Sequence, residues 1–190
     1  MTKNPSDVIY RVDAEGYLTF VNEGWNAFAV LNDTPELLGP AVLGRRVADG
    51  IAGGETRLIY DRLRERALAG ARIELPYRCD SPMLRRRMSL TIVAVGAELE
   101  FRSRLLDLAM RPAVRVLEPQ GRLREASAGQ APRAGAMLTV CSWCNRGRIG
   151  SRWAELEEVV AELRLFDAPV PQLTHGLCHD CQLRVMTESA

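Results

Sequence analysis

Four of the five cysteines form two pairs with the spacing of metal-binding turns. The first pair is Cys141 and Cys144, and the second is Cys178 and Cys181. A CxxC turn presents two thiolates together, and two such turns complete the tetrahedral sulfur cage that Zn²⁺ prefers in structural sites. Because four thiolates leave no open coordination position, we expect a zinc site that stabilises the fold and catalyses no reaction.

Other chemistry is open to the same cysteines. Two disulfides would require an oxidising compartment, whereas the first residues of the chain lack the apolar run of a signal peptide, which favours the cytoplasm. A thioredoxin-like redox CxxC follows a strand and opens a helix. A redox role of this kind gives no reason for the motif to occur twice in one chain. Thiolate cages also bind iron. Structural zinc is therefore the favoured interpretation, while a redox switch or another metal stays open.

Two histidines lie inside this cysteine cluster. His175 precedes Cys178 by three residues, and its imidazole is expected to hydrogen-bond a thiolate or a backbone carbonyl beside the metal. The alternative is that His175 replaces a cysteine as a ligand, but four cysteines are already available. His179 lies between Cys178 and Cys181 and is expected to face solvent.

A change of composition predicts two domains. Residues 118–136 are rich in Ala, Gly, Pro and Arg, and we expect a linker there between a domain at 1–117 and a zinc-binding module at 137–190. A chain of 190 residues suits one domain with its own core plus a small module that needs a metal. No stretch approaches the ~20 apolar residues of a membrane span.

The charge balance argues against a general attraction to nucleic acid. The net charge is +1, which gives no overall field toward a polyanion or an anionic membrane. Binding to nucleic acid would need a local patch. The run Arg85-Arg86-Arg87 is one candidate, although such runs are usually solvated faces.

The first domain has the pattern of an α+β fold. Five strands are predicted, at residues 8–12, 17–22, 72–80, 88–95 and 99–105. Four helices are predicted, at residues 24–31, 35–38, 43–51 and 55–69. This order favours a five-stranded antiparallel sheet with short helices on one face.

The interior of that domain is predicted to be rich in aromatic and sulfur-containing side chains. Such a composition suits both a filled core and a small-molecule pocket, and a filled core is the favoured interpretation. Cys79 alternates with Leu75 and Tyr77, so we expect a small buried apolar side chain there. The candidate pocket residues are Tyr10, Phe20, Trp25, Phe28, Tyr60, Tyr77, Cys79, Met88 and Phe101.

The C-terminal module is predicted to contain one helix, with Ser151 as its N-cap. Apolar residues spaced by three and four would form its buried face, which is expected to pack over the two CxxC turns. These residues are Trp153, Leu156, Val159, Val160, Leu163 and Phe166.

Two regions resemble known families. The segment DAEGYLTFVN at residues 13–22, the helix with Trp25 and Phe28, and the order of elements resemble a PAS sensor domain over residues 6–110. The C-terminal region is similar to a CxWC…HGxCxxC motif that follows some bacterial PAS domains and signalling kinases. The matching positions are Cys141, Trp143, Cys144, Trp153, Glu157, His175, Gly176, Cys178 and Cys181.

The resemblance implies a bacterial signalling protein in which a PAS sensor or dimerisation domain is coupled to a zinc module that contacts a protein partner. It also implies a homodimer. The sequence has no Gly-rich phosphate loop, and its histidines are His175 and His179 alone, so we expect no kinase and no enzyme. A DNA- or RNA-binding regulator and a thiol redox switch remain the alternatives.

Overall fold

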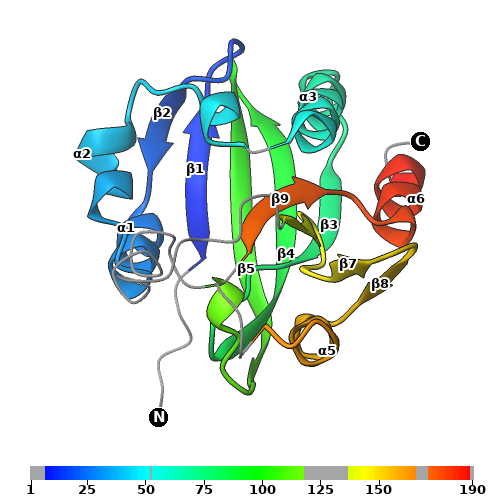
Figure 1. Ribbon diagram of the computed structural model, residues 1–190. Coiled ribbons are helices and arrows are strands. Elements are labelled where there is room, and N and C mark those ends of the chain that lie inside the picture. Colours follow the sequence, from blue (N-terminus) through cyan, green and yellow to red (C-terminus); the bar gives the residue numbers. More distant parts are fainter. Residues whose placement is uncertain (1–6, 52, 118–136, 166–170, 189–190) are drawn as a thin grey trace. The chain divides into compact units, whose positions relative to one another are not determined.

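The computed structural model describes residues 7–51, 53–117, 137–165 and 171–188 (Figure 1). The predicted linker at 118–136 lies outside the described residues. The chain divides into two compact units, of which the first comprises Met1–Tyr77, Met88–Leu106 and Arg184–Ala190. The second comprises Arg78–Arg87 and Asp107–Leu183. The division into domains at 1–117 and 137–190 stays a prediction.

The predicted α+β class and five-stranded antiparallel sheet are confirmed. The strand order in this sheet is β2-β1-β5-β4-β3. Its strands are β1 (Val8–Val12), β2 (Leu18–Val21), β3 (Ile73–Arg78), β4 (Leu84–Val95) and β5 (Glu98–Met110). Two strands are longer than predicted. β4 begins at Leu84 instead of residue 88, and β5 ends at Met110 instead of residue 105.

Several short helices and one long helix complete the N-terminal half. They are α1 (Glu23–Leu31), η1 (Pro35–Leu37), α2 (Gly39–Val42), η2 (Val47–Gly50) and α3 (Gly54–Leu68), and η3 (Arg115–Leu117) follows β5. The helix predicted at 43–51 is correct only over Val47–Gly50, where η2 forms. Its N-terminal part is not helical. Gly44 has a φ of +78°, and the backbone N–H groups of Gly44 and Leu18 donate to the carbonyls of Leu18 and Arg45, so this stretch pairs with β2. None of the described helices has the length and apolar character needed to cross a membrane.

The turn between β1 and β2 is stabilised by two residues of the turn itself, Asp13 and Gly16. Asp13 accepts a hydrogen bond from the backbone N–H of Tyr17 at 2.8 Å through its side chain, and Gly16 has a φ of +91° that favours glycine. After β2, the Asn22 side chain caps α1 by accepting from the backbone N–H of Trp25 at 2.9 Å. These two side chains fix where the strand pair ends and the helix begins.

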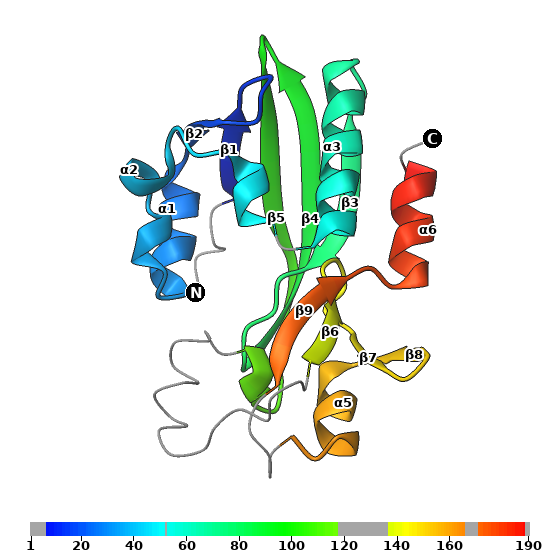
Figure 2. The same cartoon turned by 45° about the horizontal axis from the view of Figure 1, so that its top comes forward.

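The core of the first unit is apolar. In Figures 1 and 2 the long helix α3 lies beside β3, and its residues Leu63 and Ala67 are fully buried. Phe101 on β5 stacks on Tyr10 of β1, with ring centroids 4.7 Å apart. Hydrophobic burial is therefore the main source of stability in this unit.

The second unit contains a sheet that the sequence analysis did not predict. Its strand order is β8-β7-β6-β9, with β6 and β9 parallel and the other pairs antiparallel. Its elements are β6 (Met137–Cys141), β7 (Gly147–Ile149), β8 (Arg152–Ala154), α5 (Leu156–Glu162) and β9 (Gln172–Gly176), and α6 (His179–Glu188) begins after β9.

The single helix predicted from Trp153 to Phe166 is wrong at its N-terminal end. Trp153 lies on β8 in register with Arg148, and the N-cap of α5 is Glu155 rather than Ser151. Gly150 has a φ of +57° and makes the tight β7–β8 turn that places Ser151 before a strand. Phe166 lies outside the described residues.

Three of the remaining apolar residues of that pattern form part of a compact core, whereas Leu163, the C-cap of α5, is 44% exposed and was wrongly predicted to be buried. Leu156, Val159 and Val160 are buried on α5, as predicted. They cluster with five other buried residues of the second unit, namely Val114, Val116, Leu138, Val140 and Ala154. Gly147 makes this packing possible, since a Cβ there would lie 2.9 Å from a Val159 methyl group.

Candidate metal centre

The parallel pairing of β6 and β9 brings the two cysteine turns together. Cys141, the last residue of β6, is in register with Gly176, the last residue of β9. Because parallel strands end at the same edge of a sheet, the turn after each strand starts from the same place. The backbone N–H of Ser142 donates to the carbonyl of Gly176 at 3.0 Å and connects the two turns.

The first turn curls back on itself after Cys141. The backbone N–H of Cys141 donates to the carbonyl of Arg146 at 2.8 Å, and that of Asn145 donates to the carbonyl of Cys141 at 2.9 Å. Asn145 has a φ of +56°, a left-handed conformation that asparagine adopts more readily than most residues. The turn thereby places Cys144 beside Cys141.

The second turn opens a helix. Cys178 immediately precedes α6, and Cys181 lies in the first turn of that helix. The backbone N–H of Cys178 points at the sulfur of Cys141, at 3.4 Å. Backbone N–H groups at a helix N-terminus favour negative charge nearby, so this position stabilises thiolates.

The four sulfurs have the geometry of a metal cage. The sulfurs of Cys141, Cys144, Cys178 and Cys181 all lie within 4.8 Å of one another. Those of Cys144 and Cys178 are 3.7 Å apart. Four sulfurs at ~2.3 Å from a central ion in a tetrahedron lie about 3.8 Å apart, so the residues fit a tetrahedral metal ion. The four cysteines could therefore hold such an ion, as the sequence suggested.

Arg146 lies against this cage, and the sequence analysis missed it. Its Nε donates to the sulfur of Cys144 at 3.3 Å, and its Nη2 donates to the sulfur of Cys178 at 3.2 Å. The same Nη2 donates to a carboxylate oxygen of Asp180 at 2.7 Å. The only sequence signal was a basic residue two positions after a CxxC turn, which by itself is not specific.

Hydrogen bonding within the cluster separates the pKa values of the cysteines. Hydrogen bonds from Cys141 and Cys181, with a further one from Arg146, lower the pKa of Cys144. The hydrogen bond to Cys144 raises the pKa of Cys141 to about 11, and hydrogen bonds to Cys141 and Cys144 raise that of Cys181. Cysteines lose their protons when they bind a metal cation as thiolates.

Two other candidate residues, His175 and Cys79, are not in the group of potential metal ligands. His175 is exposed on β9, in register with Val140. Its predicted hydrogen bond to the site stays a prediction. Cys79 follows β3 and is half-buried, and burial raises the pKa of its thiol, which suits the predicted apolar role.

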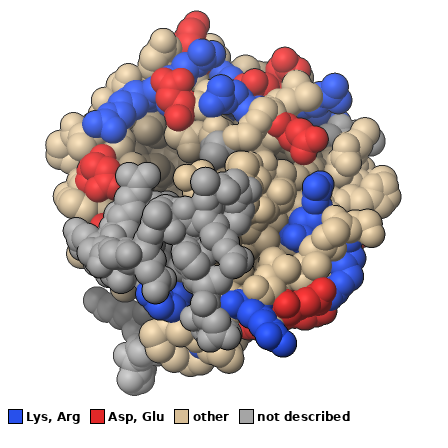
Figure 3. Space-filling view, viewed as in Figure 1, with Lys and Arg blue, Asp and Glu red and all other residues tan. Residues whose placement is uncertain are grey.

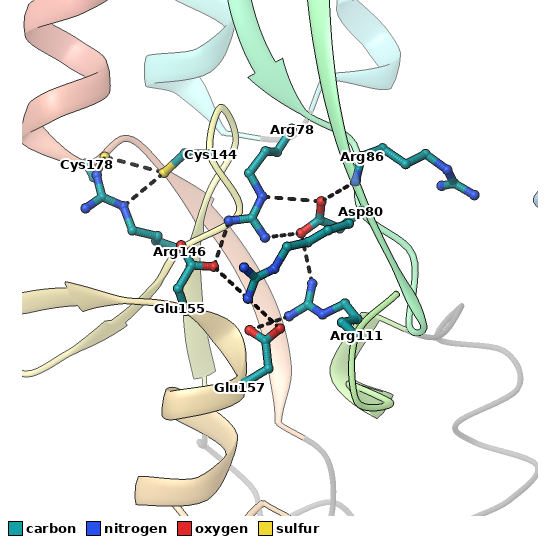
Figure 4. A network of polar contacts seen from close by, with 10 residues as sticks. Arg78, Asp80, Arg86, Arg111, Cys144, Arg146, Glu155, Glu157 and Cys178 are labelled. Carbon is teal, nitrogen blue, oxygen red and sulfur yellow. Dashed lines mark hydrogen bonds and ion pairs between the residues drawn. The ribbon is translucent and has the colours of Figure 1, made fainter. Parts of the chain in front are cut away.

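A closed ring of ion pairs is the second polar feature of this unit (Figure 4). Asp80 pairs with Arg78 and, at 2.9 Å, with Arg111. Glu155 pairs with Arg78 at 2.7 Å and with Arg85 at 3.5 Å.

Glu157 completes this ring by pairing with Arg85 at 2.7 Å and with Arg111 at 2.8 Å. Three arginines therefore alternate with three carboxylates, and we call this set the arginine–carboxylate ring. The side chain of Asp80 is 0% exposed and that of Arg111 is 1% exposed, so each of these buried charges depends on its partners.

The ring corrects the interpretation of the arginine run. Arg85 is held by Glu155 and Glu157, and the guanidinium of Arg86 donates to the carbonyl of Cys79 at 3.3 Å. Arg87 alone of the three is exposed. The run is therefore partly structural: Arg86 is buried, and Arg85 is paired although its side chain is 41% exposed.

The candidate pocket residues are mostly core. Tyr10, Trp25, Tyr60 and Phe101 contact one another through their rings, and Met88 is buried, whereas Phe20 is 41% exposed. The hydroxyl of Tyr77 and that of Ser103 are hydrogen-bonded at 2.9 Å. The cavity lined by Tyr60 and Phe101 has a volume of about 20 Å³, which is room for about one water molecule. Phe28 is partly buried on α1, and Cys79 belongs to the other unit.

Comparison with known proteins gives no family assignment. No protein-family model matches the chain, and no curated protein is significantly similar to it.

Proposed function

We propose that this chain is a signalling or regulatory binding protein of bacterial PAS type, in which a sensor or dimerisation domain is coupled to a structural zinc module that contacts a protein partner. The observation that carries the proposal is the sulfur cage, in which four cysteines would supply all four ligands of a tetrahedral metal ion. A metal ion with four protein ligands has no position left for a substrate. The module then acts by presenting a surface, and we propose no enzymatic role.

Zinc is the metal that the donor set favours. Four thiolates in two turns, three of them on buried cysteines, are typical of structural zinc sites. Iron also binds such cages, so metal analysis of the purified full chain is the test. About one zinc per chain is expected, and iron or a pair of disulfides would contradict the assignment.

The PAS-like part of the proposal is supported by the order of elements in the first unit. Two strands, several short helices, one long helix and three strands follow one another, which is the order on which the resemblance rests. The small cavity beside Tyr60 and Phe101 favours a filled core. We therefore favour protein association over small-molecule sensing as the role of this half.

Homodimer formation through the PAS-like half is part of the same proposal. Sedimentation of the full chain at tens of micromolar tests it, with a dimer expected. A monomer would remove the dimer from the proposal while leaving the metal module unaffected.

The partner can be sought with a matched pair of baits. The zinc-loaded full chain is expected to capture a protein from an extract of its native organism, and Cys178→Ser, which lacks one ligand of the cage, is expected to lose it. Cys79→Ser leaves the cage intact and serves as the control. Capture that is equal for all three baits would exclude the metal module as the contact.

The two alternative functions are less well supported. A nucleic-acid-binding module needs free cations, but Arg78, Arg85 and Arg111 are neutralised within the arginine–carboxylate ring. On the face shown in Figure 3, acidic side chains lie among the basic ones. A thiol redox switch would appear in the metal analysis as zinc-free, disulfide-bonded protein. A salt-dependent nucleic-acid binding assay tests the first alternative.

A further inference from the structure

Arg146 occupies an unusual place among the arginines of the second unit, because two of its contacts are with sulfur. Its guanidinium reaches one cysteine from each turn, Cys144 from the first and Cys178 from the second. Asp180 holds the guanidinium by accepting from the same Nη2 that donates to Cys178, at 2.7 Å. These contacts are made from two nitrogens of one planar fork, a geometry that lysine lacks.

Cys144 is the cysteine on which this contact matters most. Cys141, Cys178 and Cys181 are buried, whereas Cys144 is only partly buried. It is therefore the sulfur that a reagent in solution can reach first. Arg146 Nε donates to this sulfur, so the guanidinium lies beside the accessible ligand of the cage.

The charge of the filled cage explains why a cation belongs there. Four thiolates around a divalent ion carry a net charge of −2, and electron density on the sulfurs makes them nucleophiles. A hydrogen bond from a charged donor withdraws part of that density and is stronger than one between neutral groups. Groups that hydrogen-bond metal ligands tune the centre in this way.

We propose that Arg146, held in place by Asp180, is a positioning residue that shields the sulfur of Cys144 from electrophiles and so keeps the metal cage closed. The inference rests on the proposed zinc module and adds a regulatory property to it. The centre is built to resist ligand exchange and oxidation, which is the behaviour of a permanent structural site. Without Arg146, the sulfur of Cys144 would react faster than the other three sulfurs of the cage.

The experiment measures alkylation of each cysteine in the zinc-loaded full chain by iodoacetamide. The sulfur forms a bond to the methylene carbon, iodide leaves with the electron pair of the broken bond, and the resulting neutral thioether no longer binds the metal as a thiolate. Peptide mass mapping gives the rate at each cysteine, and a metal indicator follows zinc release. Cys79, outside the cage, is the internal reference in every sample.

Arg146→Ala is expected to raise the alkylation rate of Cys144 about tenfold or more relative to Cys79, the effect of losing a hydrogen bond to a charged group. Zinc release should accelerate in parallel. Arg146→Lys should give an intermediate rate, because it keeps the charge but not the fork. Arg148→Ala, which removes an exposed arginine from the neighbouring strand β7, should match the wild type.

Three results would overturn the inference. They are an unchanged Cys144 rate in Arg146→Ala, an equal acceleration at all four cage cysteines, which would mean a loosened fold, and an equal effect of Arg148→Ala. If Arg146→Ala does not retain zinc, Asp180→Asn carries the test. It keeps the Arg146 side chain but removes the carboxylate that positions it, so it should raise the Cys144 rate selectively but less than Arg146→Ala. A wild-type chain that binds no zinc would instead refute the proposed module, and the shielding role with it.

Discussion

The two units of this chain are stabilised in different ways. The first buries large apolar side chains such as Phe101, Leu63 and Ile92, and the ion pair between Arg64 and Asp61 there is partly exposed. The second has an apolar core of Val, Leu and Ala side chains, a cage of cysteines and a ring in which Asp80 and Arg111 are buried. Polar and metal-ligand groups thus supply stability that a small core of buried apolar surface cannot. The two units should therefore unfold under different conditions.

Removal of the metal should produce the largest effect. Cys178→Ser, or treatment of the wild type with a strong chelator, is expected to unfold the second unit and leave the first folded. Zinc contributes ~10–16 kcal/mol in small zinc-finger peptides, which is as much as the whole stability of many domains. Of the three tryptophans, Trp143 and Trp153 belong to the second unit. In Trp25→Phe protein, tryptophan fluorescence therefore reports the unfolding of the second unit alone. Cys79→Ser is the control, and a second unit that stays folded without metal would contradict the comparison.

Breaking the arginine–carboxylate ring should come next. Asp80→Asn removes the carboxylate that Arg78 and Arg111 share, and Arg111 is left buried with one partner fewer. We expect a loss of about 3–5 kcal/mol in the zinc-loaded protein, measured by urea denaturation. Asp61→Asn, at a partly exposed ion pair of the first unit, should cost no more than about 1 kcal/mol. Similar losses for the two variants would show that burial of the ring is unimportant.

Creating a cavity in the core of the first unit should lower the stability slightly less than breaking the arginine–carboxylate ring. Leu63→Ala removes a fully buried side chain of α3, with an expected cost of about 2–5 kcal/mol. The cost should be the same with and without chelator, because the first unit contains no part of the cage. Leu58→Ala on the same helix removes a side chain that is largely exposed and should change stability by less than about 0.5 kcal/mol. A chelator-dependent effect of Leu63→Ala would mean that the two units unfold together.

The smallest effect should be the pH dependence of a single carboxylate in the first unit. Burial raises the pKa of Glu100, but hydrogen bonds from Arg102 and Arg11 outweigh it, and the net pKa is lowered. A lowered folded-state pKa stabilises the fold above the unfolded value of about 4.3, and this contribution is lost as the pH falls. Glu100→Gln should therefore lose less stability than the wild type on acidification, by under about 1 kcal/mol. Urea denaturation between pH 6 and 3.5 measures this, and parallel curves would contradict it.

Local patterns in the sequence were sufficient for much of the first unit. The turn between β1 and β2 depends on Asp13 and Gly16, which are close in the chain, and β3 follows from strict alternation around Ile73 and Leu75. Helix α3 was predicted within one residue at each end. Such elements depend on neighbours a few residues apart, so one sequence contains the information.

Long-range contacts explain what the sequence did not reveal. Arg78 pairs with Glu155, and Arg85 with Glu157, across more than seventy residues. No local pattern connects such partners, so Arg85 resembled an ordinary surface arginine. Trp153 has helical spacing relative to Leu156 and Val160, yet pairing with β7 decides its conformation. The cysteines were recognisable because their spacing is itself local, whereas Arg146 is recognised only from its place beside the sulfurs.

The composition of the second unit constrains how it can be inherited. Its residues come from two separate stretches, Arg78–Arg87 and Asp107–Leu183, and the arginine–carboxylate ring contains members of both. Recombination that transferred only the cysteine-containing stretch would bring Glu155 and Glu157 without Arg78 and Arg85. The recipient would receive the metal ligands but lack half of the charges that balance the ring. We therefore expect that related proteins with this metal centre acquired both stretches, Arg78–Arg87 and Asp107–Leu183, in a single recombination event.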